Sequence, residues 1–599
     1  MRAPSGETKM RPTIVKNNQP LPSNLAVLKF GGSVLGDAQA VHSAAHEIYR
    51  FVRRGEKVIA VVSAIAGETD ALMTLARDVG GCENAPGKAS LLRLGEIRAA
   101  ALLALALERV GLDARAVDPA EIDLRAEGSP DDAGLCGLNH DRLAALLAAH
   151  EVLIVPGFSG VLENGQPALL GRGGTDLSAV YLGVALNAKR VRLIKDVDGL
   201  YAGDPKTDPN PRRFSQINWE DAREICGHSI QGHALEYAQK HDLRLEIAAS
   251  ARAFDTRIAP NSTSSHAPAQ TRKLKVALLG FGTVGEGVYA HLDRHQDLFE
   301  VSGILVRDAA KERDSNAPAH LISTDASEVF ATRPDIVVEM IGGVDAADAF
   351  ILNAFFGGAD VVSANKAVMA ANFDNLNAAS ARAGRALRYS AAVGGGVPML
   401  EALDQAREEG GIVSVQGVIN GTANFILDRL AEGCPFDQAV SEAQEKGFAE
   451  ADPSADLDGD DAAAKLCLMA RHGFEMPLRA SQISLESLSD LDQASIDAAR
   501  QEGKVIRQIS EIRRDAKGAL KASVSLKTLE KDHYLAAAKG EQNRLVINLQ
   551  NGQNLSLRGK GAGRWPTAEA VMADLLDIHR LRGQYEENIS VRAPEPACA

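Results

Sequence analysis

The chain has 599 residues, of which 45% are hydrophobic and 24% charged, so it is long enough for several globular domains with ordinary cores. Its formal net charge of −14 argues against a nucleic-acid-binding protein. No apolar run approaches the roughly 18 residues of a membrane span, so we expect no membrane partner. The six cysteines form no Cys-x-x-Cys pair, and the N-terminus lacks an apolar signal segment, which together favour a cytoplasmic protein.

The elements fall into two α/β halves. Residues 1–24 are polar and contain prolines, and we expect a disordered tail there. Short β-branched runs alternate with Ala- and Leu-rich helical runs on both sides of residues 259–273, a Pro/Ser/Thr-rich stretch that predicts a linker. This alternation predicts parallel sheets with crossover helices in both halves. Residues 583–599 are expected to form a frayed tail.

The first half opens with an apolar run that ends in a lysine and a glycine pair: Lys29 is followed by Gly31, Gly32 and Ser33. Backbone amides of such a turn can cradle phosphates while the ammonium neutralises their charge. A plain glycine turn explains the same residues without a ligand. Further motifs follow in order, namely Gly95-Glu96, GRGGTD over 171–176 and KDVDGLYAGDP over 195–205.

In this order the motifs resemble those of aspartate kinases, over residues 25–258. The resemblance implies an amino-acid kinase-like α/β sandwich that binds ATP and Mg²⁺ and phosphorylates L-aspartate. It places Lys29 on the transferred phosphoryl group, Asp176 beside it as an organiser, and Glu96 and Arg172 on aspartate. It surrounds the nucleotide and its magnesium with four further residues: Asp196, Asp198, Tyr201 and Asp204.

Two positions depart from the aspartate kinase pattern. Lys195 stands where relatives usually have threonine, and Gln231 stands where a lysine usually faces the nucleotide. The missing lysine removes a charge that would stabilise phosphates, whereas Lys195 could either replace that charge or distort the site. Two hypotheses stay open: a bifunctional enzyme with an active kinase, or a monofunctional enzyme with a degenerate kinase domain.

The second half opens with a buried strand that runs into Gly280, Gly282 and Gly285, spaced as GxGxxG. In such a turn the first glycine bends the chain, the second admits a pyrophosphate, and the third lets helix and strand pack closely. A helix pattern follows, and its first residues, Thr283 and Val284, would face the phosphates. A glycine-rich turn without a ligand is the weaker alternative.

The expected cofactor is NADP, with NAD as the alternative. The second strand should end near Arg307, where NAD sites usually carry an acid and an arginine suits a 2′-phosphate. Lys311 adds positive charge, whereas the neighbouring Asp308 weakens the preference. A solvated Arg–Asp pair explains these residues without any cofactor contact.

An acidic stretch precedes an alanine-rich helix pattern. Six acids crowd into a dozen positions: Glu450, Asp452, Asp456, Asp458, Asp460 and Asp461. Lys465 follows Asp461 by four residues, so the two share one helix face. An EF-hand is excluded, because the position that needs a bidentate glutamate is Lys465. Carboxylates followed by a lysine suit an amino-acid zwitterion and a proton donor, whereas a solvated acidic loop is the alternative.

Five further motifs follow in the second half: 363–366 (SANK), 392–398 (AVGGGVP), 421–426 (GTANFI), 447–465 and 559–567. In this order they resemble the motifs of homoserine dehydrogenases, and the resemblance covers nearly all of 274–582. The resemblance implies a Rossmann domain over 274–400 and an α+β catalytic and dimerisation domain over 401–582. It also implies NADP-dependent interconversion of L-aspartate 4-semialdehyde and L-homoserine in threonine and methionine biosynthesis, by a homodimer or higher homo-oligomer.

The same resemblance assigns roles to single residues. Lys366 and Lys465 match the two active-site lysines, and Lys465 would exchange a proton with the substrate oxygen. Glu450 matches the position that holds the substrate ammonium. Asp456 and Asp461 match acids that orient the lysine and hold the substrate.

Two further positions complete the expectations for this half. Asn365, with Lys366, lies where a strand end would meet the nicotinamide. Ser390 replaces an acid that many relatives carry near a monovalent-cation site, which puts a sodium or potassium requirement in doubt. The sequence does not identify which residues of this half would bind a metal ion.

Overall fold

The computed structural model divides into two compact units, one made mainly of residues up to Ala269 and the other mainly of residues from Gln270. The structure describes residues 21–80, 86–203, 207–208, 212–226, 230–252, 255–260, 263–266, 272–450, 452–515 and 517–592. Most of the tail predicted over 1–24 therefore lies outside the described residues. In the described part of the chain, no helix is long and apolar enough to span a membrane.

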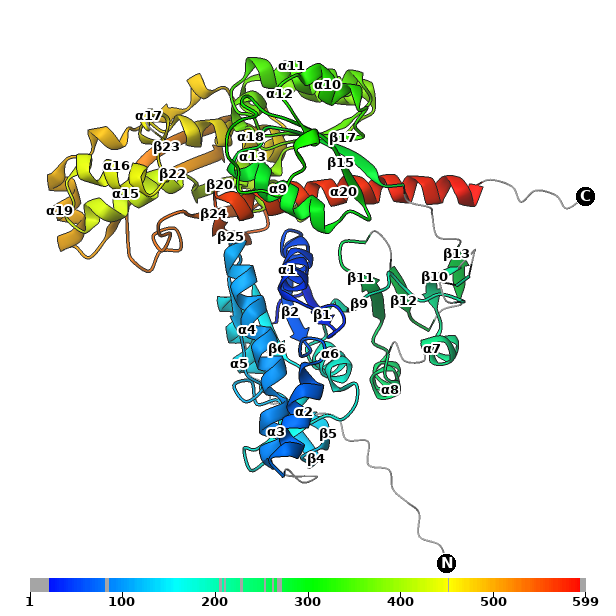
Figure 1. Ribbon diagram of the computed structural model, residues 1–599. Coiled ribbons are helices and arrows are strands. Elements are labelled where there is room, and N and C mark those ends of the chain that lie inside the picture. Colours follow the sequence, from blue (N-terminus) through cyan, green and yellow to red (C-terminus); the bar gives the residue numbers. More distant parts are fainter. Residues whose placement is uncertain are drawn as a thin grey trace, which may run out of the picture. The chain divides into compact units, whose positions relative to one another are not determined.

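The first unit is built on a mixed sheet with parallel central strands (Figure 1). Its described strands, in spatial order, are β13 (Ser264–His266), β10 (Arg213–Ile217), β12 (Asp255–Ile258), β11 (Leu245–Ala249), β9 (Arg190–Lys195), β1 (Leu25–Phe30), β2 (Lys57–Val62), β6 (Val152–Pro156) and β3 (Ala114–Ala116). The central strands are nearly continuous apolar runs because both faces of a parallel sheet are buried. Lys29 and Lys195 lie at the carboxyl ends of neighbouring parallel strands, so they share one edge of the sheet.

Helices and a smaller sheet complete this unit. The helices are α1 (Ala38–Val52), α2 (Glu68–Asp78), α3 (Pro86–Leu92), α4 (Leu94–Arg109), α5 (His140–Ala149), α6 (Gly174–Ala185), α7 (Trp219–Cys226) and α8 (Gly232–Lys240). The smaller sheet has the order β5 (Asp132–Gly137), β4 (Arg125–Ser129), β7 (Ser159–Val161) and β8 (Pro167–Leu169). The predicted α/β sandwich is confirmed for this half.

The second unit begins with a Rossmann domain, as predicted. Its parallel sheet has the order β16 (Ile322–Ser323), β15 (Phe299–Leu305), β14 (Leu274–Leu279), β17 (Ile336–Glu339), β18 (Asp360–Ser363) and β19 (Leu387–Arg388). Figure 1 shows α10 (Ala326–Ala331), α11 (Asp345–Phe356) and α12 (Lys366–Ala383) on one side of this sheet. On the other side lie α9 (Thr283–Arg294) and the long α20 (Arg564–Arg592).

The α+β domain that follows carries a mostly antiparallel sheet. Its order is β21 (Ser484–Leu485), β23 (Leu520–Leu529), β22 (Val505–Arg514), β20 (Ile412–Val418), β24 (Gln542–Leu549) and β25 (Asn554–Lys560). Its helices are α13 (Ser390–Gly394), α14 (Met399–Glu408), α15 (Gly421–Ala431), α16 (Phe436–Glu445), α17 (Ser454–Leu457), α18 (Asp460–Phe474) and α19 (Gln493–Gln501). One apolar core runs from the Rossmann strands to α18, joining Val337 and Val361 to Leu466 and Met469. The two domains of this unit therefore hold their facing residues in fixed positions.

Two segments differ from the sequence expectations. Within the predicted linker 259–273, β13 pairs antiparallel with β10 at the sheet edge, where a strand with one neighbour need not be apolar. Residues 261–262 and 267–271 of that linker lie outside the described residues. The segment 583–599 was expected to form a frayed tail, but α20 extends into it as far as Arg592, and residues 593–599 lie outside the described residues.

Candidate active site

The turn after β14 has the geometry of a phosphate-binding turn. Gly280 has a φ of 99°, which favours glycine. A side chain at Gly285 would place its Cβ 2.5 Å from the carbonyl oxygen of Gly280, so only glycine lets α9 start this close to the strand. Gly282 instead faces open space at the N-cap of α9, directly before Thr283 and Val284. The turn therefore fits a dinucleotide pyrophosphate at the helix N-terminus.

The residues predicted to bind the adenosine ribose belong to the loop after β15, the strand next to β14. β15 ends at Leu305, and Arg307 and Lys311 are exposed in the loop that follows. Arg313, which the sequence analysis missed, donates to the carbonyl oxygens of Phe281 (3.2 Å) and Asp308 (2.7 Å). This arginine ties the loop to the glycine turn, and no local pattern in the sequence signals such a contact.

Two lysines distant in sequence meet on one carboxylate. Lys366, the first residue of α12, places Nζ 2.5 Å from Oδ1 of Asp461. Lys465, one turn along α18, places Nζ 2.9 Å from Oδ2 of Asp461 and donates to the carbonyl oxygen of Ile419 at 2.8 Å. Asp461 and Lys465 are buried, whereas 46% of the Lys366 side chain is exposed. The cluster can therefore meet a substrate through one partly exposed lysine and one buried lysine.

An asparagine connects this cluster to the other acids. Asn420 donates from Nδ2 to Asp456 (2.8 Å) and to Asp461 (3.0 Å), while its Oδ1 caps α15 at Ala423. The sequence analysis missed Asn420, although an asparagine before a helix pattern is a capping signal. Glu450 is exposed, and its charge contributes to the site's electrostatics.

Charge coupling sets the protonation states of the cluster. Burial opposes the charge on Lys366, but Asp461, Asp456 and Glu450 outweigh it and raise the pKa of that lysine. Burial would also neutralise Asp461, yet Lys465 and Lys366 hold the pKa of this carboxyl well below its usual range. Burial raises the pKa of Asp456, and the nearby Asp461 adds to this shift. Asp461 is therefore the permanent anion of the site.

The position that departs from the family pattern also has an acid nearby. Ser390, buried at the start of α13, donates its hydroxyl to Oε2 of Glu401 at 3.0 Å. The carboxylate of Glu401, on α14, therefore lies next to Ser390, the position at which many relatives carry an acid.

The first unit contains a separate polar cavity of about 520 Å³. Asp176, in the first turn of α6, accepts contacts from Lys29 Nζ at 2.7 Å and from Lys195 Nζ at 3.1 Å. The burial of Lys29, together with the charge of Lys195, lowers the pKa of Lys29, although Asp176 opposes that shift. The cavity is also lined by glycines and small polar residues, including Gly32, Ser33, Gly67, Gly173, Gly174 and Gln231.

Glu96 lies in the same cavity as an almost fully buried carboxyl. Its Oε1 accepts from the backbone N–H of Ala64 at 3.1 Å, and its buried Oε2 has no hydrogen-bond partner among the residues that the structure describes. Burial raises its pKa to about 7. Such an unsatisfied buried oxygen suits a donor brought by a ligand.

The other residues predicted for the kinase site are placed differently. Gly31 follows Lys29 in the same turn, and its missing Cβ leaves room for the lysine Nζ. Arg172 is exposed and does not line the cavity. Tyr201 donates to Asp198 at 2.6 Å, also outside the cavity lining. Asp196 is exposed, and Asp204 lies outside the described residues.

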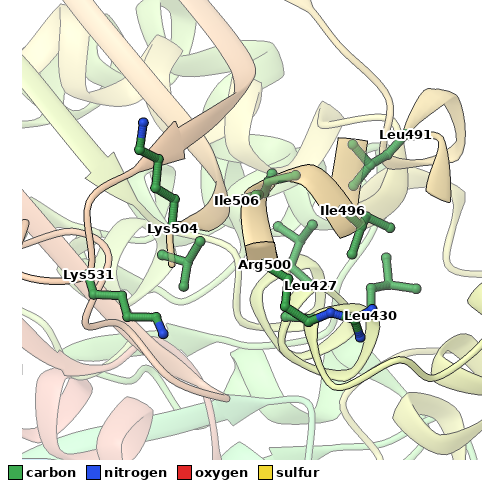
Figure 2. Close-up of a pocket in the computed structure, with 11 residues that line it drawn as sticks. Leu427, Leu430, Leu491, Ile496, Arg500, Lys504, Ile506 and Lys531 are labelled. Carbon is green, nitrogen blue, oxygen red and sulfur yellow. The ribbon is translucent and has the colours of Figure 1, made fainter. Parts of the chain in front are cut away.

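The α+β domain contains a third cavity, of about 150 Å³, and Figure 2 shows the side chains that line it. Leu427 and Leu430 of α15, Ile496 of α19 and Ile506 of β22 form its apolar wall. None of the predicted site residues lines it. Its apolar wall offers no acid–base pair, so the chemistry is better placed at the lysine–aspartate cluster.

A glycine turn at the N-terminus of a Rossmann helix, followed by a lysine–aspartate–lysine cluster in the next domain, defines an NAD(P)-dependent dehydrogenase. Comparison with known families agrees. The model of the homoserine dehydrogenase NAD-binding domain matches residues 280–390, and that of homoserine dehydrogenase matches 398–576. The model of the amino acid kinase family matches 24–252.

Individual relatives are similar over the second half. A homoserine dehydrogenase from Synechocystis sp. is 36% identical over 327 residues, covering 53% of this chain and 75% of the relative. One from Corynebacterium glutamicum is 36% identical over 319 residues, covering 51% and 72%. A crystal structure of a homoserine dehydrogenase from Thiobacillus denitrificans matches at 32% identity and a TM-score of 0.49, covering 54% of this chain and 76% of that one. The chain belongs to the homoserine dehydrogenase family and carries an N-terminal amino acid kinase family domain.

Proposed function

We propose that the second unit interconverts L-aspartate 4-semialdehyde and L-homoserine with NADP(H), in threonine and methionine biosynthesis. The observation that carries this proposal is the convergence of Lys366 and Lys465 on Asp461, beside Rossmann strand ends. Two cations and a permanent anion can hold a polar substrate and move a proton, while the glycine turn binds the dinucleotide.

In the proposed mechanism, Lys465 holds the carbonyl oxygen of the semialdehyde and gives it a proton as the alcohol forms. Lys465 takes that proton back in the oxidation of homoserine. When bound, NADP(H) would supply or accept the hydride at the carbon atom that carries this oxygen. Asp461 fixes Lys465 through one oxygen and Lys366 through the other, so both ammonium groups keep their orientation during proton transfer. Glu450 and Asp456 supply negative charge for the substrate ammonium.

The preference for NADP(H) is supported by the loop after β15. Arg307 and Lys311 provide positive charge there, and Arg313 anchors that loop to the glycine turn. An arginine at this strand end suits a 2′-phosphate. The family resemblance favours a homodimer or higher homo-oligomer.

The test is a steady-state assay of the full chain with aspartate semialdehyde and either NADPH or NADH. We expect reduction to homoserine, with kcat/KM at least about tenfold higher for NADPH, since a charge-assisted phosphate contact contributes about 1.5–3 kcal/mol. Absence of homoserine with both cofactors would refute the assignment, whereas equal use of both would refute only the cofactor preference.

A second function is favoured by the cavity of the first unit. We propose that this unit binds ATP and Mg²⁺ and transfers phosphate to the side-chain carboxylate of L-aspartate. Lys29 and Lys195 supply two cations for the phosphates, and the unpartnered Glu96 Oε2 is positioned to receive an amino-acid ammonium. In this proposal Lys195 replaces the charge that Gln231 lacks.

The test is formation of aspartyl hydroxamate by the full chain with ATP, Mg²⁺, aspartate and hydroxylamine. Lys29→Ala serves as the blank. Lys29-dependent hydroxamate would support the bifunctional hypothesis. If the wild-type chain forms no hydroxamate above the blank while the same preparation retains dehydrogenase activity, the hypothesis of a degenerate kinase domain would be favoured.

A further inference from the structure

A fully buried carboxylate stands at the carboxyl end of the Rossmann sheet. Glu339 is the last residue of β17, whose other residues are apolar, and none of its surface is exposed. Burial raises its pKa despite several hydrogen bonds. Among the described residues, no lysine, arginine or histidine forms an ion pair with it. Burying an acid without a counterion costs free energy, and the hydrogen bonds that the carboxyl accepts must offset that cost.

The partners of the Glu339 carboxylate come from the loop after β17 and from the end of β18, beside the candidate site. Its Oε2 accepts from the hydroxyl of Ser363 at 2.7 Å. Its Oε1 accepts from the backbone N–H of Ile341 at 2.9 Å and from Nδ2 of Asn365 at 3.2 Å. The carboxylate therefore connects the ends of two parallel strands, β17 and β18, with Asn365, the N-cap residue of α12.

The contact with Asn365 fixes which way its amide points. Oε1 of Glu339 is an acceptor here, because the backbone N–H of Ile341 can only donate to it, so the NH₂ group of Asn365 faces Glu339. The amide oxygen is then left to cap α12, where it accepts from Ala367 (3.1 Å) and Val368 (3.4 Å). The NH₂ group also donates to the carbonyl oxygen of Gly343 at 2.8 Å.

The capped helix begins with the lysine that contacts the catalytic aspartate. Lys366 is the first residue of α12, and its Nζ lies 2.5 Å from Asp461. We propose that Glu339 is a positioning residue of the dehydrogenase: by orienting Asn365 it fixes the start of α12 and so presents Lys366 to Asp461. This inference rests on the proposed function of the second unit.

The first test is a double-mutant cycle on the full chain. Glu339→Met keeps the side-chain volume but removes both acceptors, and Glu339→Gln keeps an acceptor for Asn365. We expect Glu339→Met to lower kcat for semialdehyde reduction about tenfold or more, with the Kd for NADPH changed less than about threefold. Glu339→Gln should recover most of this loss. In a Lys366→Ala background, Glu339→Met should cost less than about twofold, because the positioned group is absent.

Equal fold losses from Glu339→Met in the presence and absence of Lys366 would overturn the proposal, since a general effect on the fold is additive. If Glu339→Met does not fold, Asn365→Ser takes its place. A serine hydroxyl can still cap α12, but it is too short to reach Glu339 as well. It should show the same dependence on Lys366, and additivity would again contradict the proposal.

The second test needs neither cofactor nor turnover. Lys366 is partly exposed, so its reaction rate with an amine-modifying reagent can be followed by peptide mass spectrometry. A loosened helix start should change that rate by several-fold in Glu339→Met and little in Glu339→Gln, with an exposed lysine such as Lys446 as the internal reference. An unchanged rate in Glu339→Met would overturn positioning even if the proposed dehydrogenase activity stands. Absent activity with an altered rate would refute the proposed function alone.

Discussion

Lys366 places its ammonium nitrogen 2.5 Å from Oδ1 of Asp461, although the lysine begins a Rossmann helix and the aspartate lies on a helix of the next domain. The second oxygen of the same carboxylate contacts Lys465, so Asp461 holds both lysines. The apolar core shared by both domains keeps this contact in place.

Replacing Asp461 by asparagine should change the pH dependence of turnover. Asp461 raises the pKa of Lys366, so its loss should lower that pKa, and the lysine should lose its proton at a lower pH than in the wild type. We expect the alkaline limb of the kcat/KM profile to move to lower pH, with kcat reduced roughly tenfold or more. Asp458→Asn, an exposed acid bonded to Ser487, is the matched control. An unmoved alkaline limb would show that Lys366 ionisation does not govern the rate.

Replacing Arg307 by alanine should act on one cofactor only. Loss of a charge-assisted contact to a 2′-phosphate should raise the KM for NADPH by about 10–100-fold and leave the KM for NADH nearly unchanged. The exposed Arg382, at the end of α12, provides an Arg→Ala control of equal charge. Parallel losses for both cofactors would show that Arg307 does not read the 2′-phosphate.

If the kinase proposal is correct, a lysine at position 231 should be able to replace Lys195. Lys195→Thr should remove a phosphate-binding cation and lower hydroxamate formation at least about tenfold. Adding Gln231→Lys to that variant should restore most of the activity, because both positions line the same cavity. Gln231→Lys alone is the control for effects of added charge. A double variant as inactive as Lys195→Thr would contradict the view that Lys195 supplies the missing charge.

Glu96 should make the stability of the first unit depend on pH. Burial raises its pKa from 4.5 to about 7, so between these values the folded chain holds a proton that the unfolded chain releases. Stability should therefore fall as pH rises from about 4.5 to 7 and then level off. Glu96→Gln cannot ionise, so its stability relative to the wild type should increase by roughly 3 kcal/mol over that window.

Fluorescence can follow this unit separately in the full chain. The chain has two tryptophans, and Trp219 is buried in the first unit, so a Trp565→Phe background leaves Trp219 as the reporter. Urea unfolding of the Trp565→Phe and Trp565→Phe/Glu96→Gln proteins at pH 5 and pH 8 gives the difference. A stability difference that is the same at both pH values would mean that Glu96 titrates near its ordinary pKa.

Local patterns predicted the α/β fold class, whereas the roles of most site residues came from the resemblance to known families. Lys465 and Asp461 could be paired because a spacing of four residues places two side chains on one helix face. The glycines of the Rossmann turn could be identified because each has a backbone role. The catalytic and binding roles of all the predicted site residues, Arg307 and Glu450 among them, stay predictions.

The contacts made across the fold could not be predicted. Asn420 bridges Asp456 and Asp461 only because the end of β20 meets the start of α18. Glu339 ends an apolar strand, and its side-chain partners Ser363 and Asn365 come from the end of another strand. Arg172 is exposed and does not line the cavity, so its predicted contact with aspartate stays a prediction. Such outcomes depend on tertiary packing, which the periodicity of one segment does not encode.

The central claim is that Lys465 transfers the proton in the dehydrogenase reaction, and a single-turnover measurement tests it most directly. Enzyme saturated with NADPH is mixed with aspartate semialdehyde, and the loss of NADPH absorbance is followed for the wild type, Lys465→Ala and Lys465→Arg. The account predicts a rate constant reduced about 10²–10⁴-fold in Lys465→Ala, with the Kd for NADPH within about twofold of the wild type. A Lys465→Ala enzyme that turns over at nearly the wild-type rate would contradict it.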